Sequence, residues 1–360
     1  MKINLSHKEK MYGPAGVLLA LFGFGWFKLS RHLGAEAAGM RAVGQHLGNL
    51  LCRLWSIIPF PVSELVWIGG IAGGLVMTGL LIRRRGLSGL TAALSRLLLC
   101  GGMIYALFSV VFLTQYSAPP LADQLGMKSG KYAVEELADT AAKVAAELNA
   151  YAQLVERDAD GLFAPADYDE LAETVQQSYR AGSMAALYGR GAGIAPKQGV
   201  LLSKIMSYLN ITGYYFPITG ESIVSSDLIE TSIPFTIAHE TAHSFGVGPE
   251  KEANFAAFLC CIESGDTELA YSGLFNGYIY LNNALYGADR DLWRAVYDTL
   301  CPEVRADLAA KNAHLKRYEG TLKKVGNTVN DTYIRATGQP EGLRSYGLMV
   351  DLIISYYKDR

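Results

Sequence analysis

Two histidines lie four residues apart in the segment HETAH, which runs from His239 to His243. On a helix, residues at this spacing share one face, so both imidazoles can reach one zinc ion. Glu240 lies beside them and can accept a proton from the water that the zinc activates. Histidine is scarce, since only six occur in the chain. The segment therefore predicts one Zn2+ ion, with His239 and His243 as ligands and Glu240 as the general base.

A catalytic zinc site needs a third protein ligand. Gly246 and Gly248 predict a chain reversal that returns the following acidic residues, Glu250 and Glu252, towards the histidines. On a regular helix these two glutamates point about 200° apart, so only one of them can bind the ion. Glu250 shares a face with Asn254, which favours Glu250 as the ligand and Asn254 as a hydrogen-bond partner of a histidine. Glu252 stays open as the alternative ligand.

Peptide hydrolysis also needs a group that stabilises the negative oxygen of the tetrahedral intermediate. Tyrosines downstream of the motif are candidates, and Tyr271 follows the second acidic segment closely. We therefore expect Tyr271 to be catalytic, with a structural place in the core as the competing interpretation.

The elements that must position these side chains are mainly helical. Pro234 predicts the start of the helix that carries the motif, and Pro249 predicts the start of the next, over 250–263. The segment 200–226 is rich in β-branched and aromatic residues and predicts a short helix and then one or two strands. An edge strand beside such a helix can pair with an extended substrate. We expect an α-rich, zincin-like metallopeptidase domain over 117–360 with a small β-sheet.

The first third of the chain predicts a membrane domain over 1–116. Three apolar runs, at 12–29, 65–82 and 97–116, approach or reach the roughly 20 residues that a helix needs to cross a bilayer. Aromatic residues mark several of their ends, as interfacial residues do. The lipid bilayer is therefore a predicted partner of the chain.

Positive charge predicts how these spans are oriented. The segment 83–96 contains four arginines and predicts a cytoplasmic basic loop, and the N-terminal tail is also basic. The segment 30–64 has fewer positive charges for its length and is expected outside. Three spans that begin in the cytoplasm place 117–360 on the extracytoplasmic face of the cell membrane.

Composition excludes several other functions. The formal net charge is −2 and no basic patch lies outside the membrane flanks, which argues against nucleic acid as a partner. The five cysteines form no CxxC pair, so a thiolate zinc site is not expected. Buried free thiols are expected at Cys260, Cys261 and Cys301, and a disulfide from Cys301 to either neighbour is the alternative.

The chain resembles bacterial multi-pass membrane proteins of unknown function that carry an HExxH zinc-peptidase signature of the gluzincin type. Five segments carry this resemblance: IPFPVSEL (58–65), LLSKIMSYLNITGYYFPITGE (201–221), IPFTIAHETAHSFGVGPEKEANFAAF (233–258), AYSG (270–273) and VNDTYIRATGQPEGLRSYG (329–347). The resemblance implies three spans, a peptidase activity and one zinc ion. Related membrane zinc proteases use ExxAD after the motif, and matching it to EKEAN implies Glu250 as ligand and Asn254 in place of the aspartate.

Three functions fit these patterns. The first is a zinc-dependent metallopeptidase that hydrolyses protein or peptide substrates at the extracytoplasmic face. The second is a metal-dependent hydrolase of cell-wall peptide or amide bonds. The third is a non-catalytic membrane sensor or scaffold that binds zinc for structure, which would have no use for Glu240 as a base.

Overall fold

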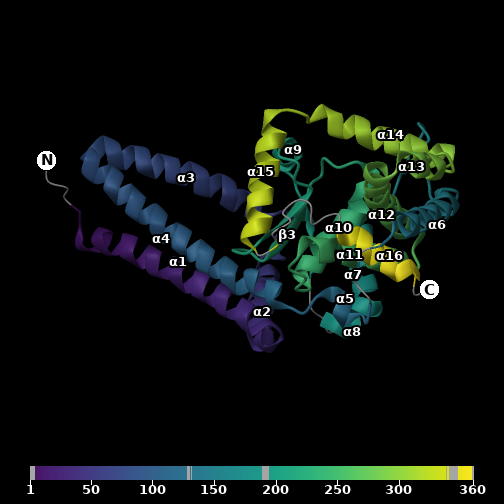
Figure 1. Cartoon of the computed structure of the whole chain (residues 1–360). Helices are drawn as coiled ribbons and strands as arrows, with labels where there is room; N and C mark the ends of the chain where they lie inside the picture. Colours follow the sequence, from purple (N-terminus) through teal and green to yellow (C-terminus); the bar gives the residue numbers. More distant parts are fainter. Residues whose placement is uncertain are drawn as a thin grey trace. The chain divides into compact units, whose positions relative to one another are not determined.

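The structure is a computed structural model that describes residues 5–127, 130, 132–188, 194–337, 339 and 348–358. Contacts divide the chain into two compact units. The first is Met1–Ala118 together with Phe216–Glu221, and the second is Pro119–Tyr215 together with Ser222–Arg360. Helices dominate both units (Figure 1). The expectation of a mainly helical chain with a small sheet is confirmed.

The first unit contains three helical segments that are long and apolar enough to cross a membrane. They are His7–Trp55, Val62–Arg85 and Leu87–Val111, which confirms the expected number of apolar N-terminal helices. Large apolar side chains on their outer faces are exposed, as lipid-facing residues are. The elements of this unit are α1 (His7–Leu33), η1 (Gly34–Ala37), α2 (Ala38–Trp55), α3 (Val62–Arg85), α4 (Leu87–Val111) and η2 (Leu113–Ser117).

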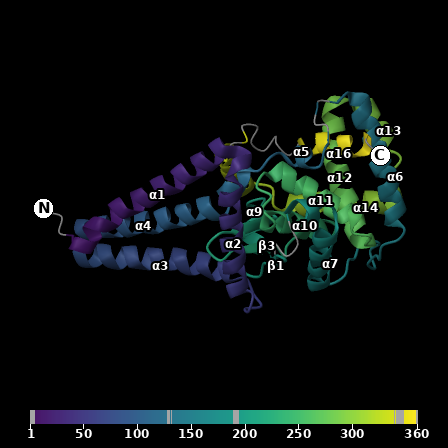
Figure 2. The ribbon, with the colours of Figure 1, turned by 90° about the horizontal axis from the view of Figure 1, so that it is seen from below.

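Helices α1 and α4 pack with their backbones in direct contact, and both views show them side by side (Figure 2). A β-carbon on Gly16 would lie 2.3 Å from the carbonyl oxygen of Leu98. A β-carbon on Gly102 would lie 2.1 Å from the carbonyl oxygen of Gly16. Small residues allow this close approach, which is how helices gain packing energy in lipid.

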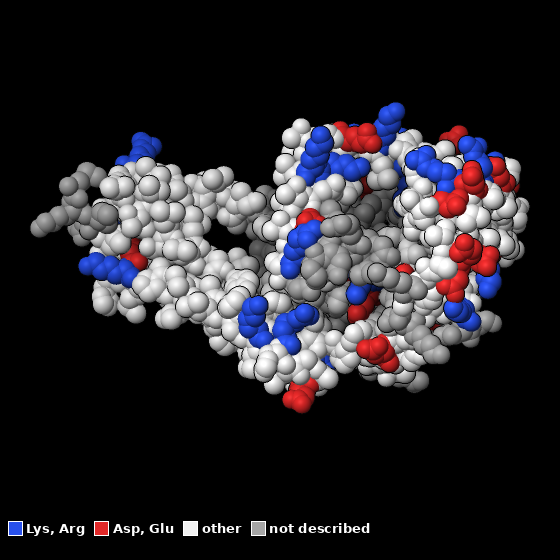
Figure 3. Space-filling view, viewed as in Figure 1, with Lys and Arg blue, Asp and Glu red and all other residues white. Residues whose placement is uncertain are grey.

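The segment 83–96, expected to be a basic loop, is helical instead, because α3 passes into α4 through Gly86 alone. Gly86 has a φ of 56°, which a glycine adopts without strain. Arg85 and Arg96 both form ion pairs with Glu9, at 2.7 and 2.9 Å. The start of α1 and the α3–α4 turn therefore lie at the same end of this unit. Charged side chains are visible there and again around α2, and the stretches of the long helices between these two ends are nearly free of them (Figure 3).

Two further boundaries in the first unit differ from the sequence expectation. The third apolar helix begins at Leu87 rather than at Leu97, since the basic residues extend the helix instead of interrupting it. The segment expected to connect the first two spans contains α2, which buries Gly44, Gly48 and Cys52 along one face. Their spacing of four residues is that of one helical stripe.

The second unit is a helical domain built around α12. Its core includes fully buried side chains from α11 and α12, among them Phe255, Phe258, Phe275 and Tyr278. Helices α6, α10, α11 and α16 pack against α12. The helices of this unit are α5 (Leu121–Gln124), α6 (Val134–Ala152), α7 (Tyr168–Ala181), α8 (Ser183–Tyr188), α9 (Ser203–Tyr208), η3 (Glu230–Ser232), α10 (Ile233–Ser244), α11 (Glu250–Glu263), α12 (Thr267–Ala288), α13 (Arg290–Tyr297), α14 (Pro302–Arg317), α15 (Thr321–Ala336) and α16 (Leu348–Lys358).

A three-stranded sheet precedes the helix that carries the histidines. Its strands are β1 (Lys197–Gln198), β2 (Gly213–Phe216) and β3 (Glu221–Val224), in the order β1-β3-β2. β1 pairs parallel with β3, with Lys197 opposite Ile223. β3 is central, so β2 is an edge strand, as expected from the sequence. The hydroxyl of Ser222 donates to the carbonyl oxygen of Glu240 at 3.2 Å, which fastens β3 to α10.

All five cysteines are free, which matches the expectation of free thiols. Cys260 and Cys261 are buried, and Cys301 is partly buried. Burial raises the pKa of Cys260 to about 12, so its thiol stays protonated and unreactive.

Candidate metal centre

Helix α10 presents the histidines because its sequence sets its start and its end. Pro234 occupies the first turn, where its missing N–H costs nothing. At the other end the N–H of Gly246 donates to the carbonyl oxygen of His243, and Gly246 has a φ of 94°. This left-handed residue reverses the chain. α11 then begins at Glu250 and packs against α10, so the expected reversal and the expected helix over 250–263 are both present.

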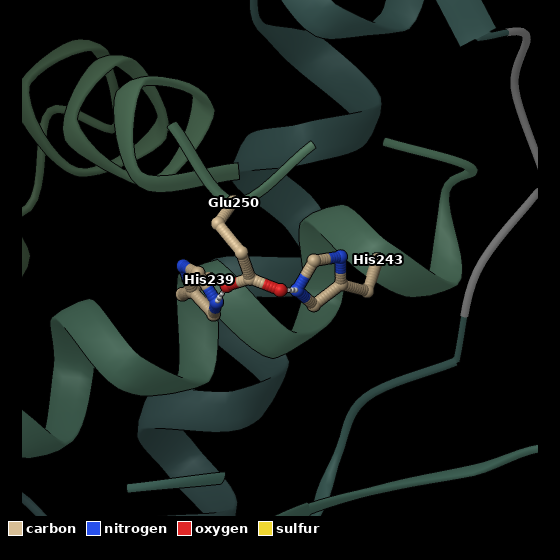
Figure 4. Close-up of side chains that lie close together, drawn as sticks. All are labelled: His239, His243 and Glu250. Carbon is tan, nitrogen blue, oxygen red and sulfur yellow. Dashed lines mark ion pairs between the residues drawn. The ribbon is translucent and has the colours of Figure 1, made fainter. Parts of the chain in front are cut away.

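The reversal brings three side chains together, as Figure 4 shows. Oxygen atoms of Glu250 lie 3.4 Å from Nε2 of His239 and 3.6 Å from Nε2 of His243. One ligand atom from each residue lies within 4.8 Å of the others. Ligand atoms of a tetrahedral zinc ion, each about 2.0–2.1 Å from the metal, lie about 3.4 Å apart. The three residues therefore fit one zinc ion.

The same three groups are strongly coupled electrostatically. Burial opposes the charge on Glu250, yet the two imidazoles outweigh it and hold the pKa of its carboxyl far below the usual range. Burial also opposes the charge on His243, but the adjacent Glu250 carboxylate raises the pKa of His243 to about 9. A buried carboxylate and two imidazoles together provide ligand atoms that suit a divalent cation.

Glu240 lies beside this cluster without belonging to it. Its side chain is buried, and its Oε2 has no hydrogen-bond partner among the described residues. Burial raises the pKa of Glu240, and the neighbouring imidazoles only partly offset this. A carboxylate with a raised pKa and a free oxygen is suited to exchange a proton with a bound molecule.

The outer nitrogens of the two histidines have different surroundings. Nδ1 of His243 lies 2.7 Å from the carbonyl oxygen of Val247, which fixes the proton on Nδ1 and turns Nε2 towards Glu250. Nδ1 of His239 is buried and has no hydrogen-bond partner in the part of the chain that the structure describes. Asn254, expected to bind a histidine, is buried near this region, but its amide nitrogen is also without a partner there. The structure therefore does not join Asn254 to either imidazole.

Two other candidates lie away from the cluster. Glu252, the alternative third ligand, points elsewhere: it is buried near the backbone of Leu121, and burial raises its pKa to about 7. The expected oxyanion residue, Tyr271, is fully buried, and its hydroxyl donates to Asp307 and lies beside Arg157. This arrangement matches the competing interpretation, in which Tyr271 is a structural residue of the core.

Three residues near the centre were not expected from the sequence. A β-carbon on Gly213 would lie 2.3 Å from Oε1 of Glu240, so the edge strand β2 touches the base. Burial and the charge of Glu240 raise the pKa of Tyr168, and burial and the charge of Glu250 raise that of Tyr280. Neither tyrosine is near the motif in sequence. The β-branched and aromatic composition of 200–226 predicted a strand here, but it did not predict which residue of the strand would touch Glu240.

Comparison with known proteins gives one match. A family model described as "Protein of unknown function (DUF3810)" matches residues 42–354. No curated protein and no solved structure matches the chain. The matched region includes α3, α4 and every residue of the candidate metal centre. The chain therefore belongs to the DUF3810 family of proteins of unknown function.

Proposed function

We propose that this protein is a membrane-anchored, zinc-dependent metallopeptidase. The observation that carries the proposal is the cluster of His239, His243 and Glu250, whose ligand atoms lie within 4.8 Å of one another beside the buried Glu240. Three protein ligands leave a fourth position open, as catalytic zinc sites do, whereas structural sites use four. Bound zinc would act as a Lewis acid and lower the pKa of water at this position towards about 7.

The chain's own residues supply the rest of the chemistry. Glu250 and the Nε2 atoms of His239 and His243 hold the metal. Glu240, with a pKa raised by burial, accepts a proton at its free Oε2 and can return it to the departing amine. General acid–base catalysis of this kind contributes roughly 10²- to 10⁴-fold to a rate.

The edge strand supplies a place for the substrate. Among the described residues β2 is an outer strand of the sheet beside β3, and Gly213 at its start touches Glu240. An extended peptide can add to such an edge through its backbone groups. Peptide backbone bound there would run past the base and the metal, so proteins or peptides are the proposed substrates.

The proposed location is the cell membrane, with the second unit on the extracytoplasmic face. Arg83, Arg84, Arg85 and Arg96 surround the end of the first unit at which α1 begins. An excess of arginine and lysine marks the cytoplasmic end of membrane helices. Three spans that start from this end finish on the opposite face.

The test begins with the purified full chain in detergent. One zinc ion per chain is expected by metal analysis, along with hydrolysis of denatured protein that is lost in Glu240→Gln and in His239→Ala. Zinc should remain in Glu240→Gln and be lost in His239→Ala. Absence of stoichiometric zinc, or zinc content unchanged by His239→Ala, would overturn the proposal.

Two outcomes would redirect it. Zinc-dependent activity on cell-wall fragments but none on denatured proteins would identify a cell-wall hydrolase. A cellular phenotype that is unchanged in Glu240→Gln but lost in His239→Ala would identify a non-catalytic scaffold. Labelling of single cysteines introduced at Gly86 and at Asn312 from either side of the membrane tests the proposed orientation.

A further inference from the structure

A pocket in the second unit, separate from the metal cluster, has a volume of about 70 Å³. A water molecule needs roughly 10–15 Å³ on the same measure, so the pocket can hold a small ligand group. Its walls come from the segment that precedes β2 in the chain, from the segment that follows β3, and from α14 and α15. The charged or titratable groups that line it are Lys311, His314, Lys323, Asp227 and Tyr318.

Lys311 is the unusual residue of this pocket. Its ammonium donates to Oγ of Ser232 at 2.8 Å and to Oδ1 of Asn276 at 2.9 Å, and both acceptors are neutral. No carboxylate of the described residues forms an ion pair with it. The ammonium also lies 5.6 Å from the centroid of the Phe275 ring. An ammonium has three donors, so one N–H has no oxygen acceptor among the described residues and can reach a ligand. Burial lowers the pKa of Lys311 to about 8, as expected for a cation without a counter-charge.

The position of Lys311 adds to this imbalance. Ser232 is the N-cap residue of α10, so the ammonium lies at the positive end of that helix's dipole. The charge of the ammonium and the positive end of the helix dipole together favour the binding of an anion at this point. Lys323 adds a further positive charge to the lining.

Asp227 is the acid of the pocket, and its carboxylate is only partly satisfied, because its Oδ2 is buried without a hydrogen-bond partner among the described residues. Burial raises its pKa, but hydrogen bonds from Tyr318 and Ser207 outweigh this and lower it overall. The charge of His314 acts in the same direction. Asp227 forms no ion pair with Lys311 among the described residues. Two lysines, Lys311 and Lys323, face this one acid in the lining, so the pocket keeps an excess of positive charge.

The pocket lies along the same elements as the metal centre. Ile211 and Thr212 line it and directly precede Gly213, which touches Glu240. Ser232 lies seven residues before His239 on one helix, which corresponds to about 10 Å at 1.5 Å per residue. An extended peptide covers that distance in about three residues.

We propose that this pocket binds the carboxylate of an acidic side chain in the peptide substrate, about three residues from the bond that is hydrolysed, with Lys311 as its main contact. The inference rests on the proposed peptidase activity and adds the class of substrate. A carboxylate would accept a hydrogen bond from the remaining N–H of Lys311 and would neutralise the excess positive charge of the pocket.

The test uses the zinc-loaded full chain in detergent and fluorogenic decapeptides. Each peptide carries one Glu at a successive position on either side of the central bond, and a matched peptide carries Gln there. At one position we expect kcat/KM to be about 10- to 100-fold higher for Glu than for Gln. Lys311→Met should remove this preference, and Lys311→Arg should keep most of it. Lys324→Met, an exposed site on α15, is the matched control and should leave it unchanged.

Binding of the same peptides to the zinc-loaded Glu240→Gln variant, followed by fluorescence anisotropy, separates this inference from the hydrolysis itself. Binding of Glu peptides that depends on Lys311, without cleavage by the wild type, supports the pocket and overturns the peptidase. Cleavage with no preference for Glu, or a preference that Lys311→Met leaves intact, overturns the pocket and keeps the peptidase. Neither binding nor cleavage of any peptide overturns both.

Discussion

Gly213 and Glu240 touch so closely that no side chain fits between them. A β-carbon on Gly213 would lie 2.3 Å from Oε1 of Glu240 and 2.7 Å from two carbon atoms of the same side chain. Glu240 is buried and cannot swing away freely. The first residue of β2 therefore determines where the proposed base lies relative to the metal ligands on its own helix.

Gly213→Ala tests this contact directly. The φ of Gly213 is not positive, so alanine is compatible with the backbone and acts only by displacing Glu240. We expect zinc content to stay at one ion and hydrolysis to fall by roughly 10²-fold or more, as in the loss of a general base. Gly287→Ala is the control, because a β-carbon there meets no atom within 4 Å. Full activity in Gly213→Ala would show that the contact has no role in placing the base.

Glu250 and Glu252 offer a matched pair for the third ligand, since both lie in the first turn of α11 and only Glu250 reaches the imidazoles. Glu250→Gln should weaken zinc binding by more than the roughly 10- to 100-fold seen when only a ligand's outer partner is lost. Glu252→Gln should leave it within a few fold, because glutamine resembles the protonated form that burial favours there. Competition with a zinc chelator measures both variants, and equal loss in the two would reject this assignment.

Zinc binding should release a proton at neutral pH. Burial lowers the pKa of His243, but Glu250 more than compensates and raises it to about 9 in the metal-free protein, so its Nε2 is protonated at pH 7. Zinc requires the neutral imidazole. Affinity should therefore rise about tenfold per pH unit from pH 7 towards 9 and then level off. Calorimetry in two buffers with different ionisation enthalpies counts the proton, and a count of zero at pH 7 would contradict this.

The sequence was sufficient to locate the cluster of His239, His243 and Glu250, because its parts are close together in the chain. The four-residue spacing of His239 and His243, the glycine stop and the proline before Glu250 specify two short helices and the turn between them. Helical geometry predicted that only one of Glu250 and Glu252 can reach the histidines, and the face that Glu250 shares with Asn254 favoured Glu250.

The other residues around the cluster could not be predicted in this way, because their positions depend on contacts between residues far apart in the chain. The periodicity of a sequence does not encode such contacts. Tyr271 was chosen for its nearness in sequence, but its hydroxyl binds Asp307, thirty-six residues later. Gly213, Tyr168 and Tyr280 approach the centre from β2, α7 and α12. The α3–α4 turn could not be predicted for another reason. It consists of a single glycine between two helix-forming runs, and one glycine does not have the composition by which a loop is recognised.

Glu221 caps a membrane helix within the first unit. Its carboxylate accepts the backbone N–H groups of Val62 and Ser63, at 3.2 and 2.8 Å, and the hydroxyl of Thr219. A carboxylate at a helix N-terminus satisfies free donors and interacts favourably with the dipole. Glu221→Gln should lower the free energy of unfolding of the full chain in detergent by about 1 kcal/mol, and Glu221→Ala by about 1–2 kcal/mol. Equal stability of both variants and the wild type would exclude this role.

Lys311→Met should make the protein more stable at pH 7, the reverse of most changes in a folded interior. The folded-state pKa of Lys311 is about 8, against about 10.4 for an unfolded lysine. The unfolded chain therefore binds more protons between pH 8 and 10.4, and stability rises with pH over that window. Below pH 8 burial of the charged ammonium lowers the free energy of unfolding by about 3 kcal/mol. The two hydrogen bonds to Ser232 and Asn276 offset part of this loss.

The variant removes the charge and these bonds together. We expect its free energy of unfolding to exceed that of the wild type by about 1–2 kcal/mol at pH 7. This advantage should fall by about 2.5 kcal/mol towards pH 10, where the wild type becomes the more stable protein. Lys324→Met, with an exposed amine, should follow the wild type at every pH. Thermal unfolding of the full chain in detergent across pH 6–10 measures all three proteins. A Lys311→Met protein that is less stable than the wild type by the same amount at every pH would mean that the ammonium stabilises the fold and needs no anionic ligand.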